Sequence, residues 1–236
     1  MDHLIKFNAL IKGRLQTRYK RFFADIELDT GETVTAHCPN PGKMLGLLAP
    51  GTEALVTYLN TPAKKLQYRL EALKERGCWV GVNTQWPNRL IARAIEAGLI
   101  PQLAGYNAIK PEVRYGRNSR IDLLASGHLA RPDTYIEIKN VHLSRSAGLA
   151  EFPDCVTLRG AKHLLELIDM VHTGFRAVVV FCVQRHDVTT FAIARDCDPG
   201  FGKAYDLACE AGVEFIPVAW EVSPEGLRFH QELTFI

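Results

Sequence analysis

An almost unbroken apolar run in the second half of the chain is the feature that most constrains the fold. Residues 176–183 read RAVVVFCV, and most side chains after Arg176 are β-branched or aromatic. A strand that is apolar on both faces must be covered on both faces, usually by helices on either side of a sheet. The run therefore predicts an α/β domain with a buried central strand.

The segments around this strand alternate between helical and extended patterns. Apolar residues recur at helical spacing in 88–99, with Asn88 as the expected N-cap, and again in 157–172. Other elements are expected at 112–115, 120–125, 135–141, 202–211 and 213–222. The order helix, three strands, helix, strand predicts a mixed α/β domain over residues 86–236 with a mixed central sheet.

Residues 1–85 have a different, β-rich pattern. Short extended segments separated by Gly and Pro turns are expected at 21–28, 33–38, 54–59, 68–73 and 78–82. Such a series predicts a small closed barrel of the OB type, although another small barrel would give the same pattern. The chain is 236 residues long, with 47% hydrophobic and 23% charged residues, which is typical of an ordinary globular protein with two domains.

Several classes of protein are not indicated. The six cysteines are widely spaced and form no CxxC pair, so neither a structural zinc site nor a disulfide framework is expected. The N-terminus has no signal-peptide pattern, and the longest purely apolar run, 177–183, is too short to cross a bilayer. We therefore expect a cytoplasmic protein that does not bind a membrane.

The most specific motif combines two acids and a lysine in the second domain. Asp122 and Glu137 lie on two predicted strands, and the turn-rich stretch 126–133 is centred midway between them. An antiparallel hairpin with that turn places the two acids opposite each other, with Cβ atoms about 5 Å apart. Two carboxylates that close repel each other unless a cation lies between them. The spacing therefore predicts a site for Mg²⁺ or Mn²⁺.

Two neighbours of Glu137 complete the predicted site. Lys139 lies on the same face of its strand as Glu137, and the backbone carbonyl of Ile138 is a further candidate metal ligand. Lys139 is expected to orient or deprotonate an attacking water, or to stabilise charge on a scissile phosphate. We therefore assign catalysis to Asp122, Glu137 and Lys139, and metal binding to Asp122, Glu137 and Ile138. The alternative for an ExK motif is a surface ion pair that contributes little.

Nucleic-acid binding is predicted from local clusters of cations, because the net charge is only +2. The candidates are Lys12, Arg14, Arg18, Tyr19, Arg21, His37 and Asn40 on the barrel, and Arg120, Arg159 and Lys162 around the acids. Cations interleaved with aromatic residues suit phosphate contact and base stacking. The alternatives are a solvated basic edge and, for His37, a packed side chain. No helix-turn-helix is indicated, so weak sequence specificity is expected.

The arrangement of the acids resembles the PD-(D/E)xK nuclease superfamily, and the whole chain resembles the sugar fermentation stimulation protein A family. The matching stretches are RYKRFFAD (18–25), HCPNPG (37–42), WPNRL (86–90), Tyr115-Gly116, SRID (119–122), YIEIKNV (135–141), FPDCVTLRGAKHL (152–164) and RAVVVF (176–181). The resemblance implies an OB-like domain, a restriction-endonuclease-like domain, DNA binding and a link to regulation of sugar utilisation. Two positions depart from the pattern: Ile121 replaces the proline of "PD", and Pro41 stands where the family commonly has threonine.

These observations leave more than one function open. A Mg²⁺-dependent deoxyribonuclease is the first hypothesis, and a DNA-binding regulator that keeps the fold without turnover is the second. An RNA-directed protein is a third, since OB-type barrels also bind RNA. A sugar-metabolising enzyme is the weakest, because no sugar-site pattern is present. Glu96 is either a further metal ligand or, preferably, a solvated helix position, and association into a homodimer is left open.

Overall fold

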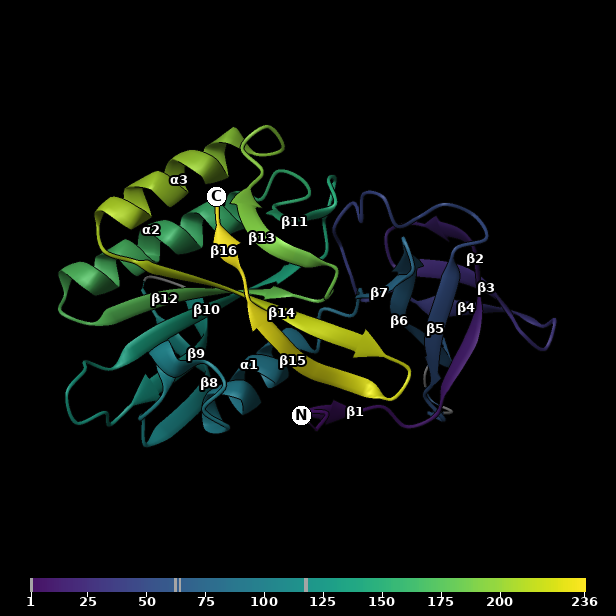
Figure 1. Cartoon of the computed structure of the whole chain (residues 1–236), viewed down its shortest axis with the longest axis horizontal. Helices are drawn as coiled ribbons and strands as arrows, with labels where there is room; N and C mark the ends of the chain where they lie inside the picture. The colour runs from purple at the N-terminus through teal and green to yellow at the C-terminus, as the bar shows by residue number, and fades with distance from the viewer. Residues whose placement is uncertain (1, 62, 64, 117–118) are drawn as a thin grey trace.

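The computed structural model describes residues 2–236 except 62, 64, 117 and 118. Figure 1 shows a β-barrel formed by the first part of the chain beside a larger α/β domain in which helices cover a long mixed sheet. This architecture confirms the mixed α/β fold with an N-terminal OB-like barrel that the sequence predicts.

The barrel is closed by a pairing between strands that are not neighbours in sequence. Its strands are β2 (Leu10–Tyr19), β3 (Phe23–Leu28), β4 (Thr33–His37), β5 (Glu53–Tyr58), β6 (Tyr68–Glu75) and β7 (Cys78–Gly81). They run in the order β4-β3-β2-β5-β6-β7, and a parallel pairing of β4 with β6 closes the five strands β2 to β6. The interior is filled by fully buried side chains such as Leu15, Ile26, Val56 and Leu70.

Strand β2 is the one barrel strand that the sequence does not predict. Its inward positions are occupied by Gly13 and Leu15, and the residues on either side of them are exposed and mostly polar. Such a segment has too few apolar residues to show a strand pattern. Gly13 is required by close packing, because a Cβ there would lie 2.5 Å from the carbonyl oxygen of Glu27 on β3.

The α/β domain is built on a seven-stranded sheet. Its strands are β8 (Ala108–Tyr115), β9 (Ser119–Ser126), β10 (Thr134–Val141), β12 (Arg176–Val183), β14 (Glu214–Ser223), β15 (Gly226–Glu232) and β1 (Ile5–Lys6). The order is β1-β15-β14-β12-β10-β9-β8, with β10, β12 and β14 parallel to one another. Strand β1 therefore pairs in the sheet of the second domain, although the predicted division at residue 85 places it on the barrel side.

Helices cover both faces of this sheet, as the apolar run at 176–183 predicts. Helix α1 (Pro87–Glu96) packs in one core cluster with Val178 and Val180 of β12. Helices α2 (Leu158–His172) and α3 (Pro199–Glu210) pack in the other with Val179 and Phe181. The side chains of β12 thus alternate between two apolar layers, which explains why the run has almost no polar residue.

A second, smaller sheet has no counterpart in the sequence prediction. It is formed by β11 (Gly148–Phe152), β13 (Val188–Ile193) and β16 (Thr234–Phe235), in the order β11-β13-β16. A short 3-10 helix, η1 (Pro101–Leu103), follows α1. Phe191 and Phe235 of the small sheet pack against Phe181 of β12, so this sheet closes one side of the apolar layer under α2 and α3.

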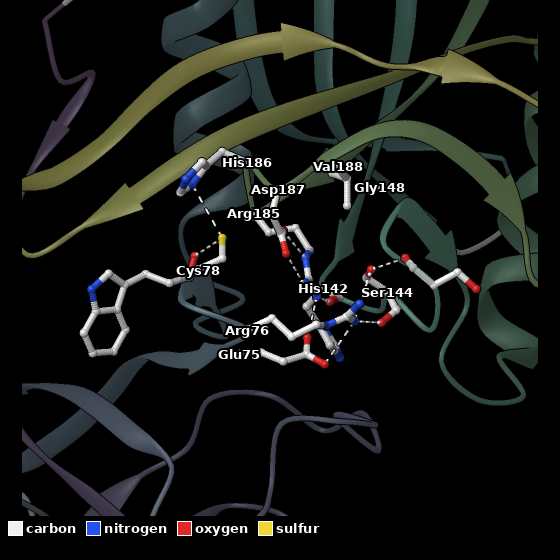
Figure 2. Close-up of polar contacts among 12 residues, drawn as sticks. Glu75, Arg76, Cys78, His142, Ser144, Gly148, Arg185, His186, Asp187 and Val188 are labelled. Atoms are coloured by element: carbon white, nitrogen blue, oxygen red, sulfur yellow. Dashed lines mark hydrogen bonds and ion pairs between the residues drawn. The ribbon is translucent and has the colours of Figure 1, made fainter.

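The barrel and the α/β domain meet through a buried arginine. Figure 2 shows Arg185 between Glu75 of β6 and Asp187, close to His142. The Arg185 side chain is fully buried; its Nη1 donates to Glu75 Oε2 at 2.8 Å, and its Nε and Nη2 each donate to Asp187 at 2.7 Å. A buried cation requires such pairing, and two acids provide it, Glu75 from the barrel and Asp187 from the α/β domain. Arg76 adds a second contact between the domains by donating to the carbonyl of Ser144.

Candidate functional site

The hairpin of β9 and β10 brings the two predicted acids together. Leu123 pairs with Ile136 and Ala125 pairs with Thr134. Continuing this register by one residue places Asp122 opposite Glu137, which is the pairing that the sequence predicts. The backbone pairing of the two strands ends there, and the Ile138 amide instead donates to the Asp122 side chain, to Oδ2 at 2.7 Å.

The second oxygen of Asp122 is positioned by α1. Asn88 Nδ2 donates to Asp122 Oδ1 at 2.8 Å. The predicted role of Asn88 as N-cap is wrong: α1 starts one residue earlier at Pro87, its N-cap is Trp86, and no side chain caps it. Burial raises the pKa of Asp122 to about 6, and repulsion from Glu137 adds to this. The carboxylate therefore lies in an environment that disfavours its charge unless a cation is bound.

Glu137 is buried, with one oxygen occupied and one unused. Its Oε1 accepts hydrogen bonds from Lys139 Nζ at 2.8 Å and from His163 Nδ1 at 2.5 Å. Its Oε2 is buried and has no hydrogen-bond partner among the described residues. Burial alone would raise the pKa of Glu137, but Lys139 and His163 outweigh it and lower the pKa. An ionised oxygen without a partner at such a position calls for a ligand.

His163 and Arg159 form a chain of contacts that ends on Glu137. His163 is buried, and Arg159 Nε donates to its Nε2 at 3.3 Å. Because Nε2 is the acceptor, Nδ1 carries the proton that is donated to Glu137. His163 thereby orients Glu137 through Oε1, whereas Oε2 has no hydrogen-bond partner among the described residues. The sequence shows a histidine on α2, but only the packing of α2 on β10 reveals this contact.

The acids lie in a cavity of about 580 Å³ whose other charged lining residues are basic, apart from Glu112. Three of the predicted phosphate-binding residues line it: Arg120 of β9, and Arg159 and Lys162 at the beginning of α2. All three are exposed, and Lys162 Nζ lies 3.5 Å from Glu166. Carboxylates beside exposed cations suit a ligand that combines a metal ion with a phosphate group. The cavity is thus compatible with the predicted chemistry.

The barrel candidates divide into exposed and structural residues. Lys12, Arg14, Tyr19 and Arg21 are exposed, and the Tyr19 ring stacks on Phe23 with centroids 5.4 Å apart. His37 is partly buried and stacks on the exposed ring of Phe22.

Arg18 and Asn40 make hydrogen bonds within the barrel. Arg18 Nη2 donates to the carbonyls of Asn40 at 2.7 Å and Gly42 at 3.0 Å. Asn40 is 3% exposed; its Nδ2 donates to the Val82 carbonyl and its Oδ1 accepts from the Gly42 amide. Both side chains therefore stabilise the 40–42 loop, and burial prevents Asn40 from contacting a ligand.

Other polar groups near the acids were not predicted. Tyr115 Oη and Glu166 Oε2 are buried and have no hydrogen-bond partner among the described residues. Burial, together with the charges of Glu137 and Glu166, raises the pKa of Tyr115. Glu96, in contrast, is exposed on α1 and does not line the cavity, which agrees with a solvated helix position.

Two general properties concern metals and membranes. Within the described part of the chain, no three His, Cys, Asp or Glu side chains are grouped as metal ligands, so a cation at Asp122 and Glu137 would need backbone or water oxygens as well.

None of the helices that the structure describes has the length and hydropathy required to span a bilayer.

Comparison with family models gives two matches that together cover most of the chain. Residues 17–82 match the model described as SfsA N-terminal OB domain. Residues 85–226 match the model described as Sugar fermentation stimulation protein RE domain. The boundary between the two matches lies at the start of α1, where the barrel ends.

Known relatives are similar over nearly their full length. A sugar fermentation stimulation protein homologue from Caulobacter vibrioides is 46% identical over 95% of this chain and 93% of its own. A homologue from Rhodospirillum centenum is 50% identical over 95% of this chain and 96% of its own. Among solved structures, Pyrococcus furiosus SfsA in complex with Ca²⁺ matches with a TM-score of 0.89 and 27% identity over all of both chains.

Proposed function

Because the chain belongs to the sugar fermentation stimulation protein family, we propose that it binds DNA and hydrolyses phosphodiester bonds at Asp122, Glu137 and Lys139. The reaction requires Mg²⁺ or Mn²⁺. By the family link, this activity serves the regulation of sugar utilisation.

The observation that carries the proposal is the unpartnered oxygen of Glu137. Glu137 Oε2 is buried beside Asp122, whose pKa is raised to about 6 by burial and by Glu137. A divalent cation there would provide the missing partner and remove the repulsion between the acids. The Pyrococcus furiosus relative was solved in complex with Ca²⁺, and Ca²⁺ and Mg²⁺ share a preference for oxygen ligands.

The chain's own residues then have distinct tasks. Asp122, Glu137 and the carbonyl of Ile138 would hold the cation, which supplies a Lewis acid and lowers the pKa of a water molecule. Lys139 is fixed by its 2.8 Å contact with Glu137, so its ammonium can orient the water or stabilise charge on the phosphate. The exposed side chains of Arg120, Arg159 and Lys162 bind the flanking phosphates.

Cleavage of labelled DNA tests the proposal. The wild-type protein is incubated with single-stranded, duplex and branched DNA in EDTA, Mg²⁺, Mn²⁺ or Ca²⁺. We expect cleavage with Mg²⁺ or Mn²⁺ and none in EDTA. Asp122→Ala should abolish it, whereas Asp169→Ala, an exposed acid on α2, should not. Equal cleavage by wild type and Asp122→Ala would show a contaminating nuclease and refute the assigned site.

A non-catalytic DNA-binding regulator is the second candidate. It is favoured by Asp122, because both of its oxygens already accept hydrogen bonds, from Asn88 and from the Ile138 amide. A carboxylate whose two oxygens both accept hydrogen bonds from the protein can have a structural role and need not take part in catalysis. Under this candidate, the wild-type protein retards DNA in a gel but cleaves none of the substrates with any of the four additions.

A further inference from the structure

Trp86, at the junction between the barrel and α1, lies between two arginine side chains. The guanidinium carbon of Arg69 is 5.6 Å from the centre of the indole ring, and that of Arg89 is 5.2 Å from it. Phe7 contacts the same ring with centroids 5.5 Å apart. The indole therefore positions two guanidinium groups, one from the barrel strand β6 and one from α1.

A buried acid presets this arrangement. The Glu71 side chain is fully buried, and its Oε2 accepts from Trp86 Nε1 and Asn83 Nδ2, each at 2.7 Å. Its Oε1 accepts from Arg69 Nε at 2.7 Å and Thr57 Oγ1 at 2.8 Å. Four donors satisfy the carboxylate, so the orientations of Trp86 and Arg69 are fixed before any ligand binds.

These residues line two hollows, Arg89 and Trp86 one of them and Arg69 the other. The first, of about 510 Å³, is also lined by residues in and around β1, namely His3, Lys6 and Asn8, and by Arg93 of α1. The other, of about 340 Å³, is lined by His37, Leu59, Lys65, Leu66, Arg69 and Gln85. We call the two together the Trp86 groove. No Asp or Glu is among the described residues that line either hollow.

The composition of the Trp86 groove selects an anionic ligand. Lys6, Arg89 and Arg93 are exposed in one hollow and Lys65 in the other, so both hollows carry positive charge. A single phosphate would occupy only one of them. Cations in two hollows, beside the aromatic rings of Trp86 and Phe7, suit the repeated phosphates of a nucleic-acid strand.

We propose that the Trp86 groove binds the sugar-phosphate backbone of DNA at a second site, separate from the cavity at Asp122 and Glu137. The two sites share no lining residue. The inference rests on the proposed function, which it extends: the DNA would contact both domains at their junction.

The salt dependence of DNA binding tests this site. Lys6→Ala/Arg89→Ala removes two exposed cations of the groove, and Lys110→Ala/Lys203→Ala removes two exposed lysines on β8 and α3 that do not line it. Affinity for fluorescent duplex and single-stranded oligonucleotides is measured in EDTA between about 50 and 200 mM salt. Circular dichroism checks that all variants are folded.

For duplex DNA we expect the slope of log affinity against log salt to lose about 2 in magnitude in the groove variant, since each phosphate contact contributes about 0.9. The control variant should keep the wild-type slope. An equal change in both variants means that only net charge matters and overturns the proposal. A wild type that binds DNA together with an unchanged groove variant refutes the second site alone. A wild type that binds no DNA refutes both this inference and DNA binding by the protein.

Discussion

Replacing Asp122 with asparagine is expected to stabilise the cation-free protein while destroying the proposed site. The pKa of Asp122 is about 6 instead of 3.8, because of burial and the nearby Glu137. This difference of about two pKa units corresponds to ~3 kcal/mol of unfolding free energy at 1.36 kcal/mol per unit. The new Oδ1 can still accept from the Ile138 amide, and the Asn88 amide can rotate so that its oxygen accepts from the new Nδ2. Asp122 keeps some contact with solvent, so we expect a gain of about 1–3 kcal/mol for Asp122→Asn at neutral pH.

The sign of the pH dependence is specific. In the wild type, the folded state takes up the Asp122 proton below about pH 6, before the unfolded state does at its ordinary pKa of 3.8. Asp122 therefore destabilises the fold fully above that pH, and its penalty disappears as the pH falls toward 3.8. The difference in unfolding free energy between Asp122→Asn and wild type should therefore be largest at alkaline pH and should decrease toward acidic pH.

Urea unfolding in EDTA, followed by tryptophan fluorescence at several pH values, measures this difference. Asp169→Asn is the matched control, since Asp169 is an exposed acid on α2; it should change stability by less than about 0.5 kcal/mol. If Asp122→Asn is no more stable than wild type at alkaline pH, or if the stability difference does not depend on pH, then the charge of Asp122 does not destabilise the folded state as we infer.

Three further predictions concern separate parts of the molecule. Lys139→Met should lower metal-dependent DNA cleavage by about 100-fold or more in a time course with labelled DNA, and unchanged cleavage would exclude its assigned role. Arg185→Met should lower the unfolding free energy by about 3 kcal/mol, because Glu75 and Asp187 lose their shared partner; a neutral effect in urea unfolding would contradict a stabilising junction. Phe181→Ala, at a fully buried position of β12, should cost about 3–5 kcal/mol in the same assay, and a loss below about 1 kcal/mol would mean that the apolar layer rearranges.

The fold was predictable where one residue pattern dominates. The run at 176–183 alternates between two apolar layers and therefore identified a central strand with the same bounds as β12. Strand β2 escaped prediction because its outward side chains are mostly polar and one inward position is a glycine. Strand β1 was not predicted, since its pairing with β15 joins residues at opposite ends of the chain and leaves no local signal.

In the candidate site, too, local features were predictable and contacts between distant elements were not. The hairpin register of Asp122 and Glu137 depends on a short turn and could be worked out from residue spacing. The contacts of Asn88 with Asp122 and of His163 with Glu137 depend on how α1 and α2 pack on the sheet. Burial of Asn40, which prevents contact with DNA, likewise depends on the closed barrel. Sequence spacing therefore identifies the acids, and only tertiary packing identifies the residues that orient them.

The central claim is that Asp122 and Glu137 together bind a divalent cation, and anomalous diffraction from a crystal soaked in Mn²⁺ tests it most directly. We expect an anomalous peak about 2.0–2.4 Å from Glu137 Oε2 and from an Asp122 oxygen, and no peak there in an Asp122→Ala crystal. The absence of a peak between the two carboxylates in the wild-type crystal, with Glu137 Oε2 contacting a protein donor instead, would contradict it.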